Sequence, residues 1–307
     1  MLLCCGAERR TAAGSFCGVP SRRQSRPAVK RVSQATVVLA LLIVVGGYIA
    51  VRHSVPVLEP SSCTAIAPGS AAQPVSLNVS QAGIAATIAG VAQRQKLPSR
   101  AVTIAYATAL QESKLTNLHS GDLDSVGVFQ QRPSEGWGPT RSLEDPVYAT
   151  TKFFAALVRV PDYRTVPVYR AAQAVQRSAD GYAYNQYAVV AARMSAAFTG
   201  QLPHAVWCWY PGMSARPRLA AASSALTSAF GPMHVWKYAD PALAVRVSGP
   251  AAGWAVAGWL VSHAGTFGIR RVAYDGYQWL SGRGTSGWTR IAGTRQPKAP
   301  PAAVMFG

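Results

Sequence analysis

One glutamate in this sequence, Glu112, stands where a carboxyl group could transfer a proton to a ligand. The pattern predicts a helix over 100–114, with Glu112 near its end. Its neighbours one and two turns earlier on the same face are the small residues Ala105, Thr108 and Ala109. A carboxyl group backed by small side chains faces space that a ligand could fill, and burial there would raise its pKa, as an acid working near neutral pH requires. Since most glutamates are solvated, the local pattern alone favours an ordinary surface residue.

The elements that would position Glu112 are mainly helices. Apolar spacing and turn signals predict helices at about 80–95, 100–114, 146–158, 168–177 and 182–198. Asp145-Pro146 is a standard helix start. Between the second and third helices, Asn117 to Gly138 carries four glycines and little helical period, which indicates a loop or a small β-hairpin.

The composition changes after Cys208. A connector rich in Pro and Gly leads to a short helix rich in Ala and Ser, and the pattern predicts another helix over 254–264. Two short strands follow at 269–274 and 277–280, joined at the turn Asp275-Gly276. These elements indicate a small α+β module.

Three short motifs carry a resemblance to a known family. Glu112-Ser113, Gly127-Val128-Phe129-Gln130 and Ala183-Tyr184-Asn185 resemble the Glu-Ser, Gly-Leu-Met-Gln and Ala-Tyr-Asn motifs of soluble lytic transglycosylases and goose-type lysozymes, in the same order. More closely, the run from about Gln81 to Gly200 is similar to a group of actinobacterial lysozyme-like envelope proteins. The segments that carry this second resemblance are ATALQES, DSVGVFQQRPSEGWG, DPVYAT and AAQAVQRS.

The resemblance implies a site that cleaves glycan strands. Glu112 would protonate the glycosidic oxygen of the MurNAc–GlcNAc linkage; in a transglycosylase it would then act as base on the carbon-6 hydroxyl of the sugar. Tyr184 would hold Glu112 or the charged intermediate. Trp137 would be a platform for a sugar ring, or equally a core or lid residue. The full set of predicted substrate-binding residues is Ser113, Ser125, Gln130, Gln131, Trp137, Arg177 and Tyr184.

A hydrolase would need a second carboxylate to activate water or stabilise the cationic transition state. Asp122 and Asp124 lie between the first two motifs, and Asp124 is the predicted second catalytic residue. Aspartate next to Gly or Ser also commonly caps turns, so a purely structural role stays open. A lysozyme-like fold can also persist without activity, so the alternative function is a non-catalytic wall-binding or wall-assembly adaptor.

The C-terminal segment GWAVAGWLVSHAGTFGIRRVAYDGYQW resembles a module of some actinobacterial and fungal wall-associated proteins, related in shape to zinc D-Ala-D-Ala carboxypeptidases. Such peptidases need a set of His and Asp ligands. Here His234 and His263 are isolated in the sequence. We therefore predict a non-catalytic module, with no metal and no cofactor anywhere in the chain.

An apolar run at 35–51 is about long enough to cross a bilayer, and basic residues dominate the segment before it. The positive-inside rule then predicts a single-pass membrane protein with a cytoplasmic N-terminus and the bulk of the chain outside. A cleaved signal peptide is the alternative; however, the residues after the run lack a small-x-small cleavage site.

Charge and cysteines are interpreted against this topology. A formal net charge of +18 suggests an acidic partner. Export removes nucleic acid, which leaves peptidoglycan and anionic cell-wall polymers as predicted partners, or a charge that only aids solubility. Cys63 and Cys208 are the exported cysteines and are predicted to form a disulfide across the ends of the lysozyme-like segment, although two unrelated thiols are the alternative.

The predicted fold class is α+β, with an N-terminal transmembrane helix, a mainly helical lysozyme-like domain and a small α+β C-terminal domain. The predicted divisions are a basic cytoplasmic tail at 1–34, the transmembrane helix at 35–51, an extracytoplasmic linker at 52–75, the lysozyme-like domain at 76–210, the accessory domain at 211–290 and a disordered tail at 291–307.

Overall fold

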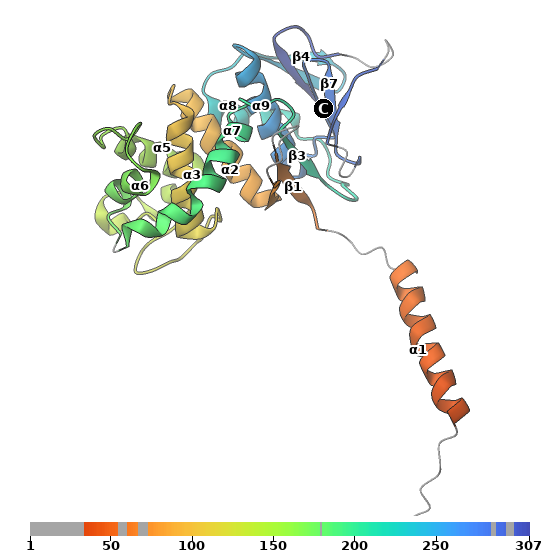
Figure 1. Ribbon diagram of the computed structural model, residues 1–307. Helices are drawn as coiled ribbons and strands as arrows, with labels where there is room; N and C mark the ends of the chain where they lie inside the picture. Colours follow the sequence, from red (N-terminus) through yellow and green to blue (C-terminus); the bar gives the residue numbers. More distant parts are fainter. Residues whose placement is uncertain (1–33, 55–59, 67–72, 179, 284–286, 293–297) are drawn as a thin grey trace, which may run out of the picture. The chain divides into compact units, whose positions relative to one another are not determined.

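The computed structural model describes residues 34–54, 60–66, 73–178, 180–283, 287–292 and 298–307. The chain divides into two compact units, Met1–Val57 and Leu58–Gly307 (Figure 1). The first unit contains helix α1, Gln34–Ser54. The predicted basic tail, apart from Gln34, lies outside the described residues.

The predicted transmembrane helix is wrong. Helix α1 does form over the apolar run, and its 21 residues begin with Gln34 and end in Arg52, His53 and Ser54. Within the part of the chain that the structure describes, no helix combines the length and the apolar character that crossing a membrane requires.

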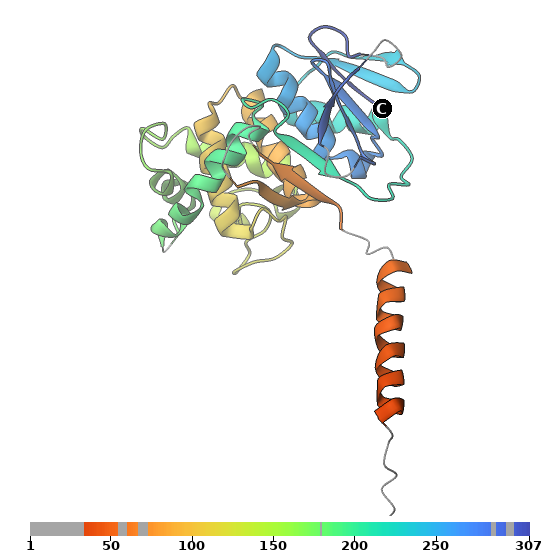
Figure 2. The same cartoon turned by 45° about the vertical axis from the view of Figure 1, so that its right-hand side comes forward.

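The second unit is α+β and not mainly helical, which corrects the predicted fold class. Most of its helices lie at one end, the six-stranded sheet lies at the other, and the three-stranded sheet lies between them (Figure 2). The helices are α2 Val79–Arg94, α3 Ser99–Ser113, η1 Pro133–Glu135, α4 Thr140–Leu143, α5 Pro146–Leu157, α6 Val168–Gln176, η2 Gly181–Tyr187, α7 Ala188–Phe198, α8 Leu219–Phe230, α9 Pro250–Ser262 and α10 Ala264–Phe267.

The second unit contains more sheet than the sequence predicted because several of its strands have only four residues, too few to give a clear local pattern. A three-stranded antiparallel sheet has the order β2-β1-β3, and a six-stranded sheet has the order β4-β5-β9-β6-β7-β8. The strands are β1 Ser62–Ala65, β2 Val75–Asn78, β3 Val206–Trp209, β4 Val235–Ala239, β5 Ala242–Arg246, β6 Arg271–Tyr274, β7 Tyr277–Leu280, β8 Trp288–Arg290 and β9 Ala303–Phe306.

Two of these strands lie where the sequence predicted irregular chain. Strand β1 lies within the predicted linker at 52–75 and is the central strand of its sheet. Strand β9 lies within the predicted disordered tail at 291–307, and all four of its residues are buried between β5 and β6. Pairing with strands distant in the sequence supplies the backbone hydrogen bonds that a local pattern does not reveal.

Helix α2 is the centre of the helical end. Residues Ala82 to Ala92 of this helix are buried, and it packs against α5, α8 and α9. The absence of a side chain at Gly90 permits this, because a Cβ there would lie 2.7 Å from the ring of Phe230. Helix α9 in turn contacts β3, β6 and β9, so one hydrophobic core continues from the helices into the six-stranded sheet.

The predicted disulfide is confirmed. Cys63 in β1 and Cys208 in β3 are register partners in the antiparallel pair and are joined by a disulfide. The bond closes the two ends of the segment that contains α2 to α7, 145 residues apart in the sequence. It therefore joins two neighbouring strands of the three-stranded sheet covalently, at the two ends of the helical segment.

Candidate active site

Glu112 lies on the last turn of α3 and is partly exposed. Its Oε1 accepts a hydrogen bond of 2.6 Å from the Tyr184 hydroxyl. Among the described residues, Glu112 Oε2 has no hydrogen-bond partner. One carboxylate oxygen is therefore fixed by the protein while the other is available to a ligand.

Tyr184 is fixed by burial and by a second polar contact of its hydroxyl group. It lies in η2, its side chain is only 1% exposed, and its hydroxyl oxygen is 3.0 Å from Ser178 Oγ. Ser178 Oγ donates to Gln173 Oε1 at 2.6 Å. Burial, followed by the hydrogen bond to Glu112, raises the pKa of Tyr184 above its usual value. The phenol therefore stays protonated and serves as a donor to the carboxylate.

The small residues behind Glu112 have a different role from the predicted one. Ala105, Thr108 and Ala109 are fully buried in α3, which packs against α2, α5, α6, η2 and α7. Small side chains there allow close helix packing instead of leaving open space. The space beside Glu112 is enclosed by the insertion 117–138 and by residues 176–178.

Ser113 fixes that insertion to the helix. Its side chain is buried, and its hydroxyl lies 2.7 Å from Val128 O and 3.1 Å from Ala109 O. The following residue, Lys114, ends α3 with a left-handed φ of 54°. Ser113 does not line the cavity beside Glu112, so the structure gives it a positioning role and no direct contact with a ligand.

The insertion is an irregular loop with two isolated antiparallel bridges, Leu118 to Gly127 and Val126 to Gln131. Gly127 is required by the fold because its φ is +78° and a Cβ would lie 2.4 Å from Leu143 O. Phe129 of the same motif is fully buried and stacks on Phe153, with ring centroids 4.5 Å apart. The second motif is therefore anchored to α5 by its apolar residues.

Gln130 and its neighbours form the floor of the site. Gln130 has a left-handed φ of 48°, donates from Nε2 to Gly127 O at 3.1 Å, and has its Oε1 3.1 Å from Ser125 Oγ. A Cβ on Gly121 would lie 1.7 Å from that Oε1, so the glycine makes room for the amide. Gln131 is 2% exposed and donates from Nε2 to Ala149 O at 3.3 Å.

A cavity of about 470 Å³ brings most of the predicted site residues together. Tyr184 joins them through its bond to Glu112, while Ser113 and Asp124 are not among the residues around the cavity. The residues that line it are Glu112, Asp122, Ser125, Gln130, Gln131, Arg132, Glu135, Trp137, Gln176, Arg177 and Ser178.

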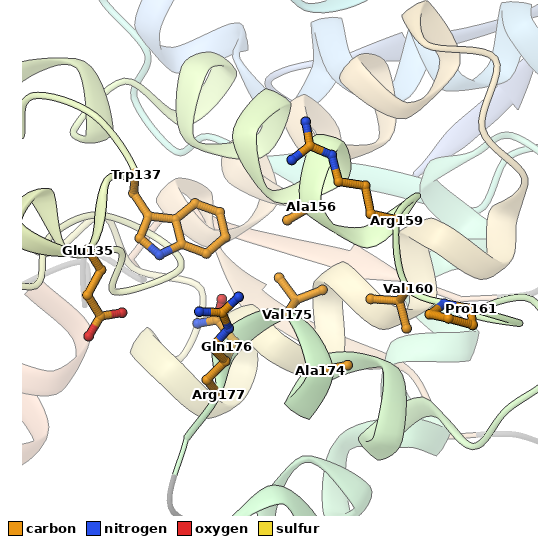
Figure 3. Close-up of a pocket in the computed structure, with 10 residues that line it drawn as sticks. All are labelled: Glu135, Trp137, Ala156, Arg159, Val160, Pro161, Ala174, Val175, Gln176 and Arg177. Carbon is orange, nitrogen blue, oxygen red and sulfur yellow. The ribbon is translucent and has the colours of Figure 1, made fainter.

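A second cavity, of about 670 Å³, adjoins the first (Figure 3). The two share the lining residues Glu135, Trp137, Gln176 and Arg177. Trp137 is partly buried and takes part in both walls, where a sugar ring could stack on its indole. The paired cavities form one extended depression suited to a chain-like ligand.

Asp124 is engaged in a structural network. Its carboxylate accepts from Ser134 N at 2.8 Å, from Ser134 Oγ at 2.9 Å and from Arg132 Nε at 3.1 Å. These bonds, with the Ser134 backbone first, lower the pKa of Asp124 to about 2. This geometry is that of an aspartate that stabilises a turn, the structural role left open for Asp124. Asp122, two residues earlier, is the aspartate that lines the cavity.

Sequence reasoning gave no site role to Glu135 or Ser178. Glu135 lines both cavities and pairs with Arg132 Nη1 at 2.8 Å. Both residues stand inside the segments RPSEGWG and AAQAVQRS that carried the family resemblance, which was the available signal. Gln176 also lines both cavities, and its Nε2 donates to Phe129 O at 2.7 Å.

The histidines of the C-terminal part lie apart from this site. His263 ends α9, and its ring stacks on Trp259 with centroids 3.9 Å apart. His234 is exposed and lies beside Trp236. Across the described residues, no group of three or more His, Cys, Asp or Glu side chains could hold a metal ion.

Comparison with known proteins gives no assignment, since no family model and no curated protein matches the chain.

Proposed function

We propose that this protein cleaves the glycan strands of peptidoglycan, with Glu112 as general acid and then general base. The observation that carries the proposal is the 2.6 Å hydrogen bond from Tyr184 to Glu112 at the wall of an open cavity that also contains Gln130. A surface glutamate without a function would need neither a buried tyrosine aimed at one of its oxygens nor a cavity beside it.

The chemistry follows from the two oxygens of Glu112. Tyr184 orients the carboxyl group through Oε1, and Oε2 carries the proton to the glycosidic oxygen as the bond from that oxygen to C1 breaks. The resulting carboxylate stabilises the oxocarbenium-like sugar. It then accepts the proton of the carbon-6 hydroxyl while O6 bonds to C1. A 1,6-anhydro sugar is formed, no water is consumed, and Glu112 is again protonated.

The carboxylates favour this transglycosylase route over hydrolysis. Asp124 is held by Ser134 and Arg132, and Glu135 is paired with Arg132. Asp122 is the remaining acidic residue at the cavity that could activate water. The transglycosylase route needs no such base, since Glu112 acts twice.

The disulfide supports a location in an oxidising compartment outside the cytoplasm, which is where peptidoglycan lies. The formal charge of +18 suits a polymer that carries carboxylates, and anionic wall polymers are further proposed partners.

The test is digestion of purified peptidoglycan by the full chain, with products identified by mass spectrometry. We expect 1,6-anhydro-muropeptides that disappear in Glu112→Gln. Glu144→Gln is the matched control, since Glu144 pairs with His119 and does not line the cavity. Reducing-end products that depend on Asp122 would replace the transglycosylase with a hydrolase. If no product forms while the protein still binds walls, the adaptor function replaces the enzyme.

A further inference from the structure

The larger cavity contains two arginines without partners. Arg159 and Arg177 are both exposed residues that line it, and within the described part of the chain neither guanidinium makes a hydrogen bond or an ion pair. In Figure 3, Arg159 lies above the other lining residues, Arg177 lies below beside Gln176, and the indole of Trp137 lies at the left between their levels. The two cations therefore belong to different elements but border the same space.

The charge around this cavity is not balanced. Glu135 is the only acidic residue in the described lining, and its carboxylate already pairs with Arg132. Two like charges at one cavity repel each other, and an anion between them would relieve that repulsion. The arrangement therefore favours an anionic ligand.

The rest of the lining is apolar apart from Gln176. Besides Trp137, it consists of small aliphatic surfaces and a proline, namely Ala156, Val160, Pro161, Ala174 and Val175. A polyanion that is hydrophilic throughout would leave these surfaces without matching contacts. A ligand with carboxylates and short alkyl side chains would use both the arginines and the apolar wall.

We propose that this cavity binds a short acidic peptide attached to the glycan strand, with Arg159 and Arg177 holding its carboxylates; this rests on the proposed function. The shared residues Trp137 and Arg177 place the cavity directly beside the one that contains Glu112, so a substituent on a bound sugar reaches it without leaving the protein surface. The planar guanidinium fork suits a carboxylate in a bidentate contact. The site thus selects glycan that still carries its peptides.

A competing role for both arginines is helix stabilisation. Arg159 follows the end of α5, and Arg177 ends α6 with a left-handed φ of 55°. Cations near helix C-termini interact favourably with the helix dipole. That role predicts a lower Tm on substitution and no change in ligand binding, which separates it from the proposal.

The experiment measures binding of soluble glycan oligomers to the full chain carrying Glu112→Gln, so that turnover does not consume the ligand. One oligomer retains its peptides and the other has been stripped of them by an amidase. We expect Arg159→Gln and Arg177→Gln each to weaken binding of the peptide-bearing oligomer roughly three- to tenfold, the range of one charge-assisted contact at a partly exposed site. For Arg159→Gln, whose side chain lines the larger cavity and not the one that contains Glu112, binding of the stripped oligomer should change less than about twofold, within the range of a surface substitution.

Arg193→Gln is the matched control, because Arg193 is an exposed arginine on α7 away from both cavities. Equal weakening of both oligomers by Arg159→Gln would overturn the peptide assignment. Displacement of the peptide-bearing oligomer by inorganic phosphate at a lower concentration than by a free acidic tripeptide would also overturn it. A lower Tm with unchanged binding would also overturn it. Failure of the proposed function is distinguished by cleavage. In that case the chain without substitutions would cleave neither oligomer, whether or not the arginine substitutions weaken binding.

Discussion

Tyr184 donates a 2.6 Å hydrogen bond to Glu112 from a position 72 residues later in the chain. The bond joins the end of α3 to the short helix η2, so the orientation of the carboxyl group depends on the packing of two separate elements. It is also the contact on which the proposed chemistry is most directly tested.

Removing the tyrosine hydroxyl should slow the chemical step. For Tyr184→Phe we expect kcat to fall roughly ten- to a hundredfold with little change in KM, because the ring still fills its buried place but the acid loses its orienting donor. Tyr182→Phe is the control, since Tyr182 is 64% exposed. Steady-state kinetics on soluble glycan oligomers provide the measurement. A Tyr184→Phe enzyme with normal kcat would contradict the role given to this contact.

Asp124 should contribute to stability above about pH 4 and little to catalysis. Its pKa is about 2 in the folded protein and 3.8 in its ordinary state, so the stabilisation is present above about pH 4 and is lost as pH falls through 2. Asp124→Asn should lower the stability above about pH 4 and make the loss of stability between pH 4 and 2 smaller, as followed by urea titrations at each pH, while the reaction products stay the same. If Asp124→Asn formed no anhydro products, Asp124 would instead be a catalytic residue.

His263 should make the fold sensitive to acid at milder pH. Burial, partly opposed by its bond to Trp259 O, lowers its pKa from 6.5 to about 4. Since the unfolded chain binds the proton more readily, stability is highest above pH 6.5 and falls as pH drops towards 4, by on the order of 3 kcal/mol. Arg94 and Asp145 share a cavity wall with this ring and add to the local charge.

Thermal unfolding across pH 7 to 4 tests this expectation. In His263→Phe the dependence of Tm on pH should become shallower over that interval, because the ring that must stay neutral is gone. His234→Phe, at an exposed position, should leave the dependence unchanged. Parallel curves for the unaltered chain and His263→Phe would assign the acid sensitivity to other groups.

The disulfide should contribute a large share of the stability. A cross-link between residues 145 apart restricts the unfolded chain strongly, so replacing Cys63 and Cys208 together by Ser should cost about 2–5 kcal/mol. A lower urea midpoint for the double variant gives the measurement. A reducing agent should lower the urea midpoint of the unaltered chain and leave that of the double variant unchanged. Any other result would contradict a stabilising disulfide between Cys63 and Cys208.

Two glycines in the insertion should differ in their tolerance of a side chain. Gly127 and Gly136 both have positive φ, of +78° and +81°. A Cβ on Gly127 meets Leu143 O at 2.4 Å, whereas a Cβ on Gly136 meets nothing within 4 Å. Gly136→Ala should therefore cost only the backbone strain, about 1 kcal/mol, and Gly127→Ala about 3 kcal/mol or more. Equal decreases in the free energy of unfolding, measured with urea, would show that Leu143 O can move away from the added Cβ at little cost.

The local signals in the sequence predicted α2, α3, α5, α6 and one hairpin, whereas the predicted helix at 182–198 is divided into the 3-10 helix η2 and helix α7. Asp145 caps α5 through its bond to Val147 N at 2.9 Å, and strands β6 and β7 meet at Asp275-Gly276 as predicted. Such features depend on a few adjacent residues. Strands β1 and β9 were missed because each has four residues and is defined by partners distant in the chain.

The candidate site was predictable in part for the same reason. Glu112, Gln130 and Tyr184 belong to short motifs and do come together. The choice between Asp122 and Asp124 was not predictable, because Leu123 between them has a left-handed φ of 55° and the two carboxylates go to different surroundings.

The β1 to β3 connection also determines how the protein responds to mechanical load. Tension applied to the chain before Ser62 enters through β1 and crosses directly to β3 through the covalent bond between Cys63 and Cys208. The chain between these cysteines, which includes Glu112 and both cavities, lies outside that path. If the two ends of the protein were pulled apart, this segment would add nothing to the extended length until the bond was reduced. The site would thus be shielded from strain transmitted along the chain.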